Sequence, residues 1–219
     1  MSEEQREYWS NVASQYDRVV DQQIGPGIRS LLRDRLATEH DLGHVVEFGC
    51  GTGFYTRTLA SKAIDVVATD LAPGMLALAE KEVTAPNVVF RSEDCQRTSF
   101  ADAVFDTAFI SLVLHFVDAD TTLAEMRRIL KPGGRLIITN LDVLALRGFD
   151  RLRCVIRIVY RGVTGYRTKP PARLGRNVLS CEQLSERLRH SGFNVTSAET
   201  IKDPTRRASI PVNYITAFA

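Results

Sequence analysis

A glycine-rich loop directly after a short apolar run constrains this chain most. Residues 44–48 read His-Val-Val-Glu-Phe, and Gly-Cys-Gly-Thr-Gly follows at 49–53. Glycine lets the backbone turn sharply and lets a ligand approach main-chain amides that a Cβ would shield. The pattern predicts a buried strand whose carboxyl end carries a ligand site, as in an open α/β sheet.

Apolar runs alternate with amphipathic segments along the rest of the chain. We expect strands at 44–48, 65–69, 87–91, 105–111, 135–140, 193–201 and 212–218. We expect helices at 3–21, 26–39, 55–62, 73–83, 121–130 and 181–191. This alternation predicts an α/β fold, a doubly wound, mainly parallel sheet of seven strands covered on both faces, with an antiparallel last strand.

Length and composition favour a single domain over residues 1–219. The formal charge of +2 is too balanced for a protein whose whole surface binds nucleic acid. Cys50, Cys95, Cys154 and Cys181 form no Cys/His cluster of metal spacing, so we expect no metal site. The N-terminus lacks signal-peptide features and no run reaches the ~20 apolar residues of a membrane span, which predicts a cytoplasmic protein.

Two features near the loop distinguish between adenosine-containing ligands. Asp70, which ends the second predicted strand, is not one of them: it can accept hydrogen bonds from both hydroxyls of a ribose, and SAM and a dinucleotide both carry one. A dinucleotide fingerprint would place its third glycine where Phe54 stands. Glu47 would repel a pyrophosphate beside the loop, whereas it suits a ligand that carries an ammonium and a sulfonium. Together they favour S-adenosylmethionine (SAM) over a dinucleotide.

Five ordered motifs resemble the class I SAM-dependent methyltransferases, which have a Rossmann-like sheet. The motifs are the 47–53 loop, Asp70, Asp94-Cys95, Phe105-Asp106 and the turn at 130–134. The segment 112–116, Leu-Val-Leu-His-Phe, is similar to the small-molecule branch with a methyltransferase type 11-like domain. The resemblance runs from about residue 8 to residue 140 and resumes over the last two predicted strands.

This resemblance implies SAM as the cofactor and assigns residues to each part of it. The methionine part would lie against the loop and the end of the fourth strand, at Gly49, Cys50, Gly51, Gly53, Ser111 and Leu112, and Glu47 would shape the loop and its hydrogen bonds. The adenosine part would be held after the second and third strands, at Asp70, Leu71, Met75, Asp94 and Cys95. Tyr16 would cover the cofactor from the N-terminal helix.

Structural roles are the alternative for several of these residues. In this alternative, Asp70 caps the helix that begins at Pro73 and does not bind a ligand, and Met75 and Cys95 fill the core. Asp106 lies at the start of its strand, far from the ligand end, and we interpret it as structural.

Methyl transfer from SAM is an in-line displacement with an activated leaving group, so alignment and exclusion of water are the main requirements. A general base is needed only for some acceptors. His115 is the candidate, because its ordinary pKa suits proton removal near neutrality. Its alternative role is to order the loop or to pack over the cofactor.

A basic segment separates the fifth predicted strand from the following helix. Residues 147–176 contain one acidic residue, Asp150, and nine basic ones: Arg147, Arg151, Arg153, Arg157, Arg161, Arg167, Lys169, Arg173 and Arg176. We expect the insertion at 141–180 and the N-terminal helices at 3–39 to form a lid over the acceptor. Tyr8, Arg157, Tyr160 and Tyr166 are its candidate contacts.

Three interpretations of this segment stay open. It could attract an anionic small molecule through arginine forks, lie on an anionic membrane surface and admit a lipid-like acceptor, or be a solvated helix face. Nucleic acid is disfavoured, because aromatic residues are sparse in the segment.

The sequence therefore predicts a SAM-dependent methyltransferase acting on a small-molecule acceptor. The alternatives are a nicotinamide-dependent oxidoreductase on a similar sheet and a non-catalytic subunit that keeps the fold as an interaction platform. The acceptor, the methylated atom and the oligomeric state stay open.

Overall fold

The computed structural model describes residues 3–146, 148–149, 179–205 and 209–219. Nearly all of the basic 147–176 segment, including Arg157, Tyr160 and Tyr166, lies outside the described residues, and so does most of the predicted 141–180 insertion. Among the described residues, no helix combines the length and apolarity that a membrane crossing requires.

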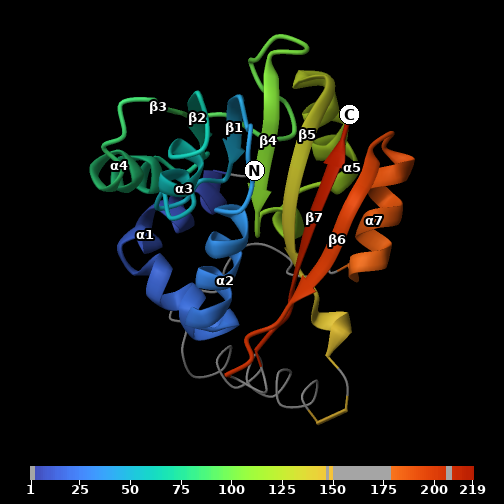
Figure 1. Cartoon of the computed structure of the whole chain (residues 1–219). Helices are drawn as coiled ribbons and strands as arrows, with labels where there is room; N and C mark the ends of the chain where they lie inside the picture. The colour runs from blue at the N-terminus through green and yellow to red at the C-terminus, as the bar shows by residue number, and fades with distance from the viewer. Residues whose placement is uncertain (1–2, 147, 150–178, 206–208) are drawn as a thin grey trace.

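A seven-stranded sheet forms the centre of the molecule (Figure 1). Its strands are β1 (His44–Phe48), β2 (Asp65–Thr69), β3 (Val88–Arg91), β4 (Phe105–Ser111), β5 (Leu130–Leu141), β6 (Asn194–Ile201) and β7 (Val212–Phe218). They are ordered β3-β2-β1-β4-β5-β7-β6. Only β7 is antiparallel to its neighbours, β5 and β6. The predicted fold class is confirmed.

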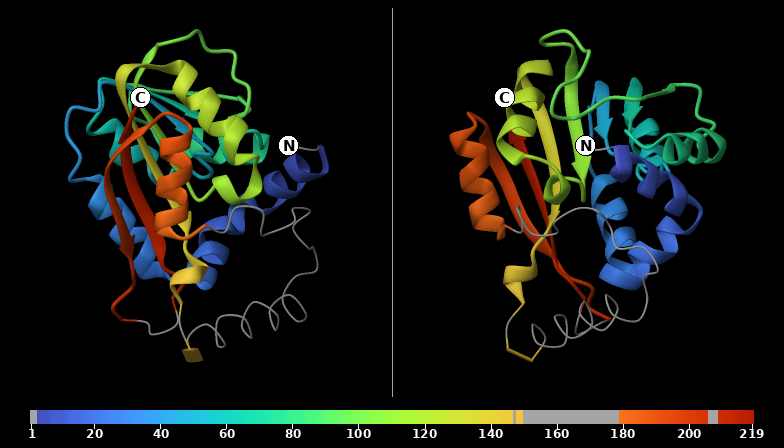
Figure 2. Two further views of the ribbon diagram at one scale, coloured as in Figure 1. Left: turned by 90° about the vertical axis from the view of Figure 1, so that its right-hand side faces the viewer. Right: turned by 180° about the vertical axis from the view of Figure 1, so that it is seen from behind.

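Helices cover both faces of the sheet (Figures 1 and 2). The longer ones are α1 (Glu3–Ile24), α2 (Pro26–Leu36), α3 (Thr56–Ala60), α4 (Pro73–Glu82), α5 (Ala119–Ile129) and α7 (Cys181–His190). Short 3-10 turns are η1 (Leu114–Phe116) and η2 (Val143–Ala145). Helices α1–α4 lie on one face, and α5 and α7 on the other.

Strand β1 shows why these residues form a central strand. Val45 and Val46 point to opposite faces and are both fully buried, in two separate hydrophobic clusters. Burial on both faces favours a continuous apolar run over an alternating one. The largest difference from expectation is in β5, which begins at Leu130 rather than at residue 135. Its pairing with β4 shifts register between Phe105 and Thr107 to include the Lys-Pro-Gly-Gly turn.

The start of β1 is tied to its neighbours by Asp106. Its carboxylate accepts the His44 backbone N–H at 2.8 Å and pairs with Lys131 Nζ at 2.7 Å. The ammonium of Lys131 and the His44 amide lower the pKa of Asp106. This is the structural role predicted for it, at the opposite end of the sheet from the glycine loop.

Candidate functional site

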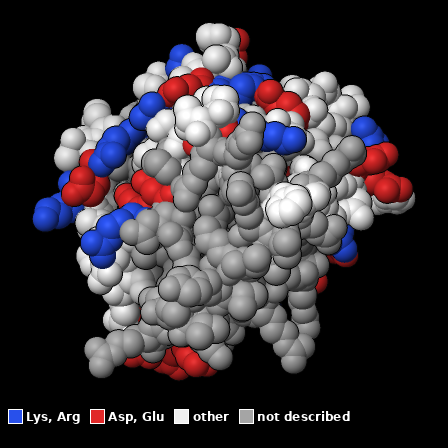
Figure 3. Space-filling model, turned by 90° about the horizontal axis from the view of Figure 1, so that it is seen from below, with Lys and Arg blue, Asp and Glu red and all other residues white. Residues whose placement is uncertain are grey.

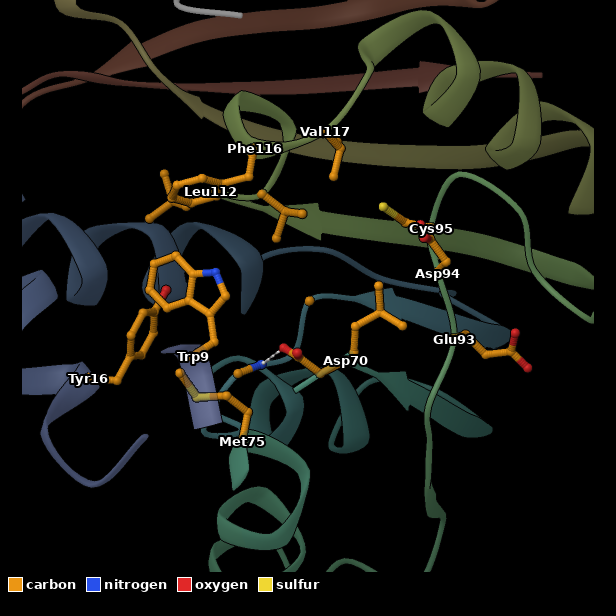
Figure 4. Close-up of a pocket in the computed structure, with 14 residues that line it drawn as sticks. Trp9, Tyr16, Asp70, Met75, Glu93, Asp94, Cys95, Leu112, Phe116 and Val117 are labelled. Atoms are coloured by element: carbon orange, nitrogen blue, oxygen red, sulfur yellow. Dashed lines mark hydrogen bonds between the residues drawn. The ribbon is translucent and has the colours of Figure 1, made fainter. Parts of the chain in front are cut away.

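A pocket lies beyond the carboxyl ends of β1, β2 and β4 (Figure 4). The lining residues come from α1, the glycine loop and the segments after β2, β3 and β4: Trp9, Tyr16, Gly49, Gly51, Asp70, Leu71, Met75, Glu93, Asp94, Cys95, Leu112, Val113, Phe116 and Val117.

The glycine loop forms one side of this pocket with bare backbone. Gly49 has a φ of +66°, and a Cβ there would lie 2.3 Å from Val113 Cγ2. Only glycine satisfies both conditions without strain. The loop thus approaches the segment after β4 closely and leaves main-chain amides facing the pocket.

Asp70 is held in place by this loop. Its Oδ2 accepts the Gly51 N–H at 3.0 Å, and its Oδ1 accepts the Ala72 N–H at 2.9 Å. Burial raises the pKa of Asp70, and the two backbone donors partly oppose that shift. The bond to Ala72 lies at the start of α4, so Asp70 supports that helix and also presents a carboxylate to the pocket.

Glu47 lies behind the loop rather than in the pocket. It is 2% exposed, and its Oε2 accepts the Thr56 hydroxyl at 2.6 Å. Burial raises the pKa of Glu47 to about 7. Because Glu47 does not line the pocket, its predicted repulsion of a pyrophosphate does not follow from this geometry. Its hydrogen bond supports the turn from β1 into α3, and its predicted role in shaping the loop stays a prediction.

Three other predicted cofactor residues also lie outside the pocket lining. Cys50 is buried in the core, and burial raises the pKa of its thiol. A Cβ on Gly53 would lie 2.7 Å from Val83 Cγ2, which points to helix packing. Ser111 Oγ is 2.8 Å from Thr139 Oγ1. Each of these residues is next to a lining residue in sequence, but adjacency in sequence does not determine whether a side chain points into the pocket.

The segments after β2 and β3 bring the predicted adenosine-binding residues together (Figure 4). Met75 lies on one side, and Asp94 and Cys95 lie across from it. Leu71 also lines the pocket. Burial raises the pKa of the Cys95 thiol to about 12, so it is neutral at pH 7. Met75 also packs with Ala13 in a small cluster, so its core and pocket roles coexist.

Helix α1 forms the opposite wall with two aromatic side chains. Trp9 and Tyr16 are seven residues apart and therefore share one helix face. Trp9 contacts Tyr16 and Phe116 edge to face, with centroids 5.9 and 5.2 Å apart. Burial, and then Asp70, raise the pKa of the Tyr16 phenol to about 12. The prediction missed Trp9, although its seven-residue spacing from Tyr16 was a usable signal.

Tyr8 and His115 do not line the pocket. Tyr8 contacts Trp9 at 5.0 Å between ring centroids. His115 is 6% exposed, and burial lowers its pKa to about 4, partly opposed by a hydrogen bond with Asn140. Because a 3-10 turn has about three residues per turn, Phe116 faces the pocket while His115 points elsewhere. The expected position of His115 as a base on the ligand side is thus corrected.

The remaining lining residues that sequence reasoning missed adjoin predicted ones. Val113, Phe116 and Val117 follow Leu112, and Glu93 precedes Asp94. Leu112 has a φ of +57°, a conformation that favours glycine. Such backbone strain is typical of functional sites. Among the described residues, no group of three His, Cys, Asp or Glu side chains is arranged to hold a metal ion.

Comparison with known proteins finds similarity over part of the chain. A family model described as a methyltransferase domain matches residues 46–138, which include most of β1, the glycine loop, Asp70 and most of β5.

Two curated relatives are similar over much of the chain. The malonyl-[acyl-carrier protein] O-methyltransferase of Serratia marcescens is 32% identical over 140 residues, 64% of this chain and 53% of that protein. The demethylmenaquinone methyltransferase of Beutenbergia cavernae is 35% identical over 153 residues, 66% of this chain and 60% of that protein. The chain thus spans little more than half the length of these relatives.

Solved structures share the fold over nearly the whole chain. A SAM-dependent methyltransferase from Thermotoga maritima has a TM-score of 0.68 at 21% identity, and covers 96% of this chain and 97% of its own. A chain of a Haloferax volcanii complex between the Trm112 methyltransferase activator and a methyltransferase has a TM-score of 0.73 at 18% identity, covering 97% and 98%. These structures show that the chain has the fold of SAM-dependent methyltransferases, and residues 46–138 are similar to the methyltransferase-domain family model.

Proposed function

We propose that this protein transfers a methyl group from SAM to a small-molecule acceptor. The observation that carries the proposal is the pairing of Asp70 with the Gly51 amide at the bare edge of the pocket. The pair fixes a carboxylate beside the loop, ready to accept the hydroxyl donors of a ribose. We further propose that residues 1–219 act as one domain in the cytoplasm.

The pocket suits SAM in its donor and acceptor chemistry. A Cβ on Gly49 would lie 2.3 Å from Val113 Cγ2, so the loop has to stay bare there, and the half-buried Asp70 has acceptor capacity beyond the Gly51 and Ala72 amides. We propose that the bare backbone of Gly49 and Gly51 lies against the methionine part and that Asp94 and Cys95 hold the adenine. Hydroxyl donors on Asp70 would favour its ionised form and offset the effect of burial.

SAM supplies a methyl group on a sulfonium, which is already an activated leaving group. The protein therefore has to orient the acceptor in line with that methyl and to exclude water. The apolar wall of Trp9, Leu112 and Phe116 supports such exclusion. His115 is buried outside this wall. We therefore propose that His115 does not take a proton from the acceptor during the reaction.

The similar proteins and the charges on the surface bear on which acceptor molecules this protein methylates. The similar proteins are named for action on malonyl-[acyl-carrier protein] and on demethylmenaquinone, which supports a metabolic acceptor. Described basic and acidic side chains lie side by side along the rim of the face seen from below, which does not favour a nucleic acid (Figure 3). An anionic or a lipid-like acceptor remains a prediction from the basic 147–176 segment.

The two alternative functions have less support. In the nicotinamide alternative, position 54 would be a glycine, but the Phe54 ring there lies 3.9 Å from the Arg29 guanidinium carbon. In the interaction-platform alternative, the cofactor site would be free to degrade, but the loop geometry and the Asp70 contacts are intact.

Calorimetry with SAM, S-adenosylhomocysteine and NADH tests the proposal. We expect the two adenosyl compounds to bind and NADH not to bind. Asp70→Asn should weaken SAM binding by about 1–3 kcal/mol, because ribose hydroxyls lose an ionic acceptor. Asp65 lies at the other end of β2, where it pairs with the partly exposed His44. Asp65→Asn therefore serves as the control, and we expect it to leave the affinity for SAM unchanged. Tight NADH binding without SAM binding would overturn the proposal.

The acceptor can then be sought directly. Incubation of the protein with SAM labelled in its methyl group and a cell extract should transfer label to a low-molecular-weight product. Label found only in protein or nucleic acid would contradict a small-molecule acceptor.

A further inference from the structure

We propose that Arg29 is a positioning residue that locks α1 onto the outer side of the glycine loop. Through Asp17, this lock holds Tyr16 over the loop and so completes the methionine side of the cofactor site. The inference rests on the proposed function, because it assigns SAM to the pocket.

Arg29 lies on α2 and is buried between helices. It is 4% exposed, and its Nη2 is 2.8 Å from Asp17 Oδ1 on α1. Its Nη1 lies 3.3 Å from Asp21 Oδ1 and donates to the Asp17 carbonyl at 3.3 Å. A buried cation requires such partners, because desolvation of an unpaired charge is costly. These contacts fix the position of α1 relative to α2.

The same carboxylate also contacts the glycine loop. Thr52 Oγ1 donates to Asp17 Oδ1 at 2.9 Å, and Thr52 is 6% exposed. The Arg29 guanidinium carbon lies 3.9 Å from the centroid of the Phe54 ring. The loop therefore presents Gly49 and Gly51 to the pocket, and Thr52 and Phe54 contact Asp17 and Arg29. One oxygen of Asp17 joins α1, α2 and the loop.

This junction determines where the neighbouring Tyr16 lies. Tyr16 Cε1 is 3.6 Å from the position of a Cβ on Gly51, so the ring rests directly against the loop. A second tie holds the other part of α1, where the Gly74 N–H donates to Ser10 Oγ at 3.2 Å. If the junction at Asp17 is lost, the Tyr16 end of α1 is released while the Ser10 end stays attached.

The two parts of the cofactor should therefore respond differently to loss of the junction. The adenosine part is assigned to Asp70, Asp94 and Cys95, which α1 does not provide. The methionine part is assigned to the glycine loop, which Tyr16 covers. A variant without the junction should lose affinity for ligands that carry the amino-acid part, and largely keep affinity for adenosine compounds without it.

The test compares two ligands in the full chain. Arg29→Met and Thr52→Val are measured by calorimetry with S-adenosylhomocysteine and with 5′-methylthioadenosine, which lacks the amino-acid part. We expect the dissociation constant of S-adenosylhomocysteine to rise by about tenfold or more in Arg29→Met and by about threefold in Thr52→Val. That of methylthioadenosine should change by less than about twofold in both. Arg33→Met on the same helix, whose partner is the adjacent exposed Asp34, should change neither.

A spectroscopic readout follows α1 itself. Trp9 is the only tryptophan in the sequence, and it lies on the pocket wall. The Tyr16 ring packs edge to face against Trp9. Release of the Tyr16 end of α1 should therefore uncover Trp9 and increase acrylamide quenching of its fluorescence in the ligand-free variants relative to wild type and Arg33→Met.

Equal losses of affinity for both ligands, or an unchanged affinity for S-adenosylhomocysteine, would overturn the role of Arg29. If Arg29→Met does not fold, Thr52→Val decides, because it removes one hydroxyl and keeps the side-chain shape. A wild-type protein that binds neither ligand would overturn the proposed function, whereas a wild type that binds both with unaffected variants would overturn this inference alone.

Discussion

The two walls of the pocket are built by different means. The sheet wall consists of Gly49, Gly51 and Asp70, and backbone amides hold its one functional side chain. The helix wall consists of Trp9 and Tyr16 on α1, and side chains from other segments hold it in place. The sheet wall thus depends on hydrogen bonds close to the strand ends, and the helix wall on contacts between distant parts of the chain.

This difference predicts how each wall responds to substitution. The sheet wall tolerates no side chain at its turns, because the backbone itself is the binding surface. Because α1 lies at the margin of the core, substitutions on the helix wall should lower the stability of the fold only moderately. The same substitutions should shift α1 over the loop and so change ligand binding. Substitutions on each wall can therefore separate folding from binding.

The largest effect is expected for Gly49→Ala, which breaks the sheet wall. A positive φ and a Cβ at 2.3 Å from Val113 should together destabilise the fold by about 4 kcal/mol. SAM binding should be lost. Urea unfolding and calorimetry measure the two effects.

Gly133→Ala is the matched control for this substitution. Gly133 has a φ of +72° but nothing within 4 Å of a Cβ, so it isolates the backbone strain. We expect a loss of about 1 kcal/mol there and unchanged SAM affinity. Similar losses of stability in the two variants would show that the close approach to Val113 has no energetic weight.

Acid should lower the free energy of unfolding by protonating His115, which lies in the segment after the sheet wall. Its pKa is about 4 in the folded protein and 6.5 ordinarily, because burial disfavours the charged ring. A lowered pKa of a base contributes stability that is present above about pH 6.5 and is lost as the pH falls toward 4. Between pH 7 and pH 4, the free energy of unfolding of wild type should fall by up to about 3 kcal/mol more than that of His115→Gln.

Urea unfolding of both proteins at pH 7, 5.5 and 4 measures this difference in slope. The comparison of slopes cancels the carboxylates that titrate in both proteins. Parallel curves for the two proteins would mean that His115 is protonated as easily in the folded state as in the unfolded state.

The smallest effect on stability is expected for Trp9→Leu, on the helix wall. Its ring makes edge-to-face contacts with Tyr16 and Phe116, which are worth roughly 1 kcal/mol each but are not additive. We expect unfolding free energy to fall by about 1 kcal/mol and SAM affinity by about fivefold. Tyr8→Leu, whose ring contacts Trp9 but does not line the pocket, should leave SAM affinity unchanged. Equal effects of the two substitutions on affinity would remove Trp9 from the site.

Much of the site was predictable where the determinant is a local motif. The glycine run after an apolar strand predicted the loop, and Asp70 at the end of the next strand predicted the carboxylate beside it. Side-chain direction was not predictable in the same way. Glu47 and His115 carry suitable chemistry next to the pocket in sequence, yet both are buried outside it.

By itself, the sequence determined the alternation of strands and helices, a mainly parallel sheet with an antiparallel last strand, and the place of the ligand edge. These follow from periodic burial and from the few residues that permit a sharp turn, both of which act over short stretches of chain. Only the tertiary structure decided which face each side chain takes and what holds α1 over the loop. The bond between Asp17 and Thr52 joins residues 35 positions apart, and packing between separate elements, which no local pattern encodes, brings them together.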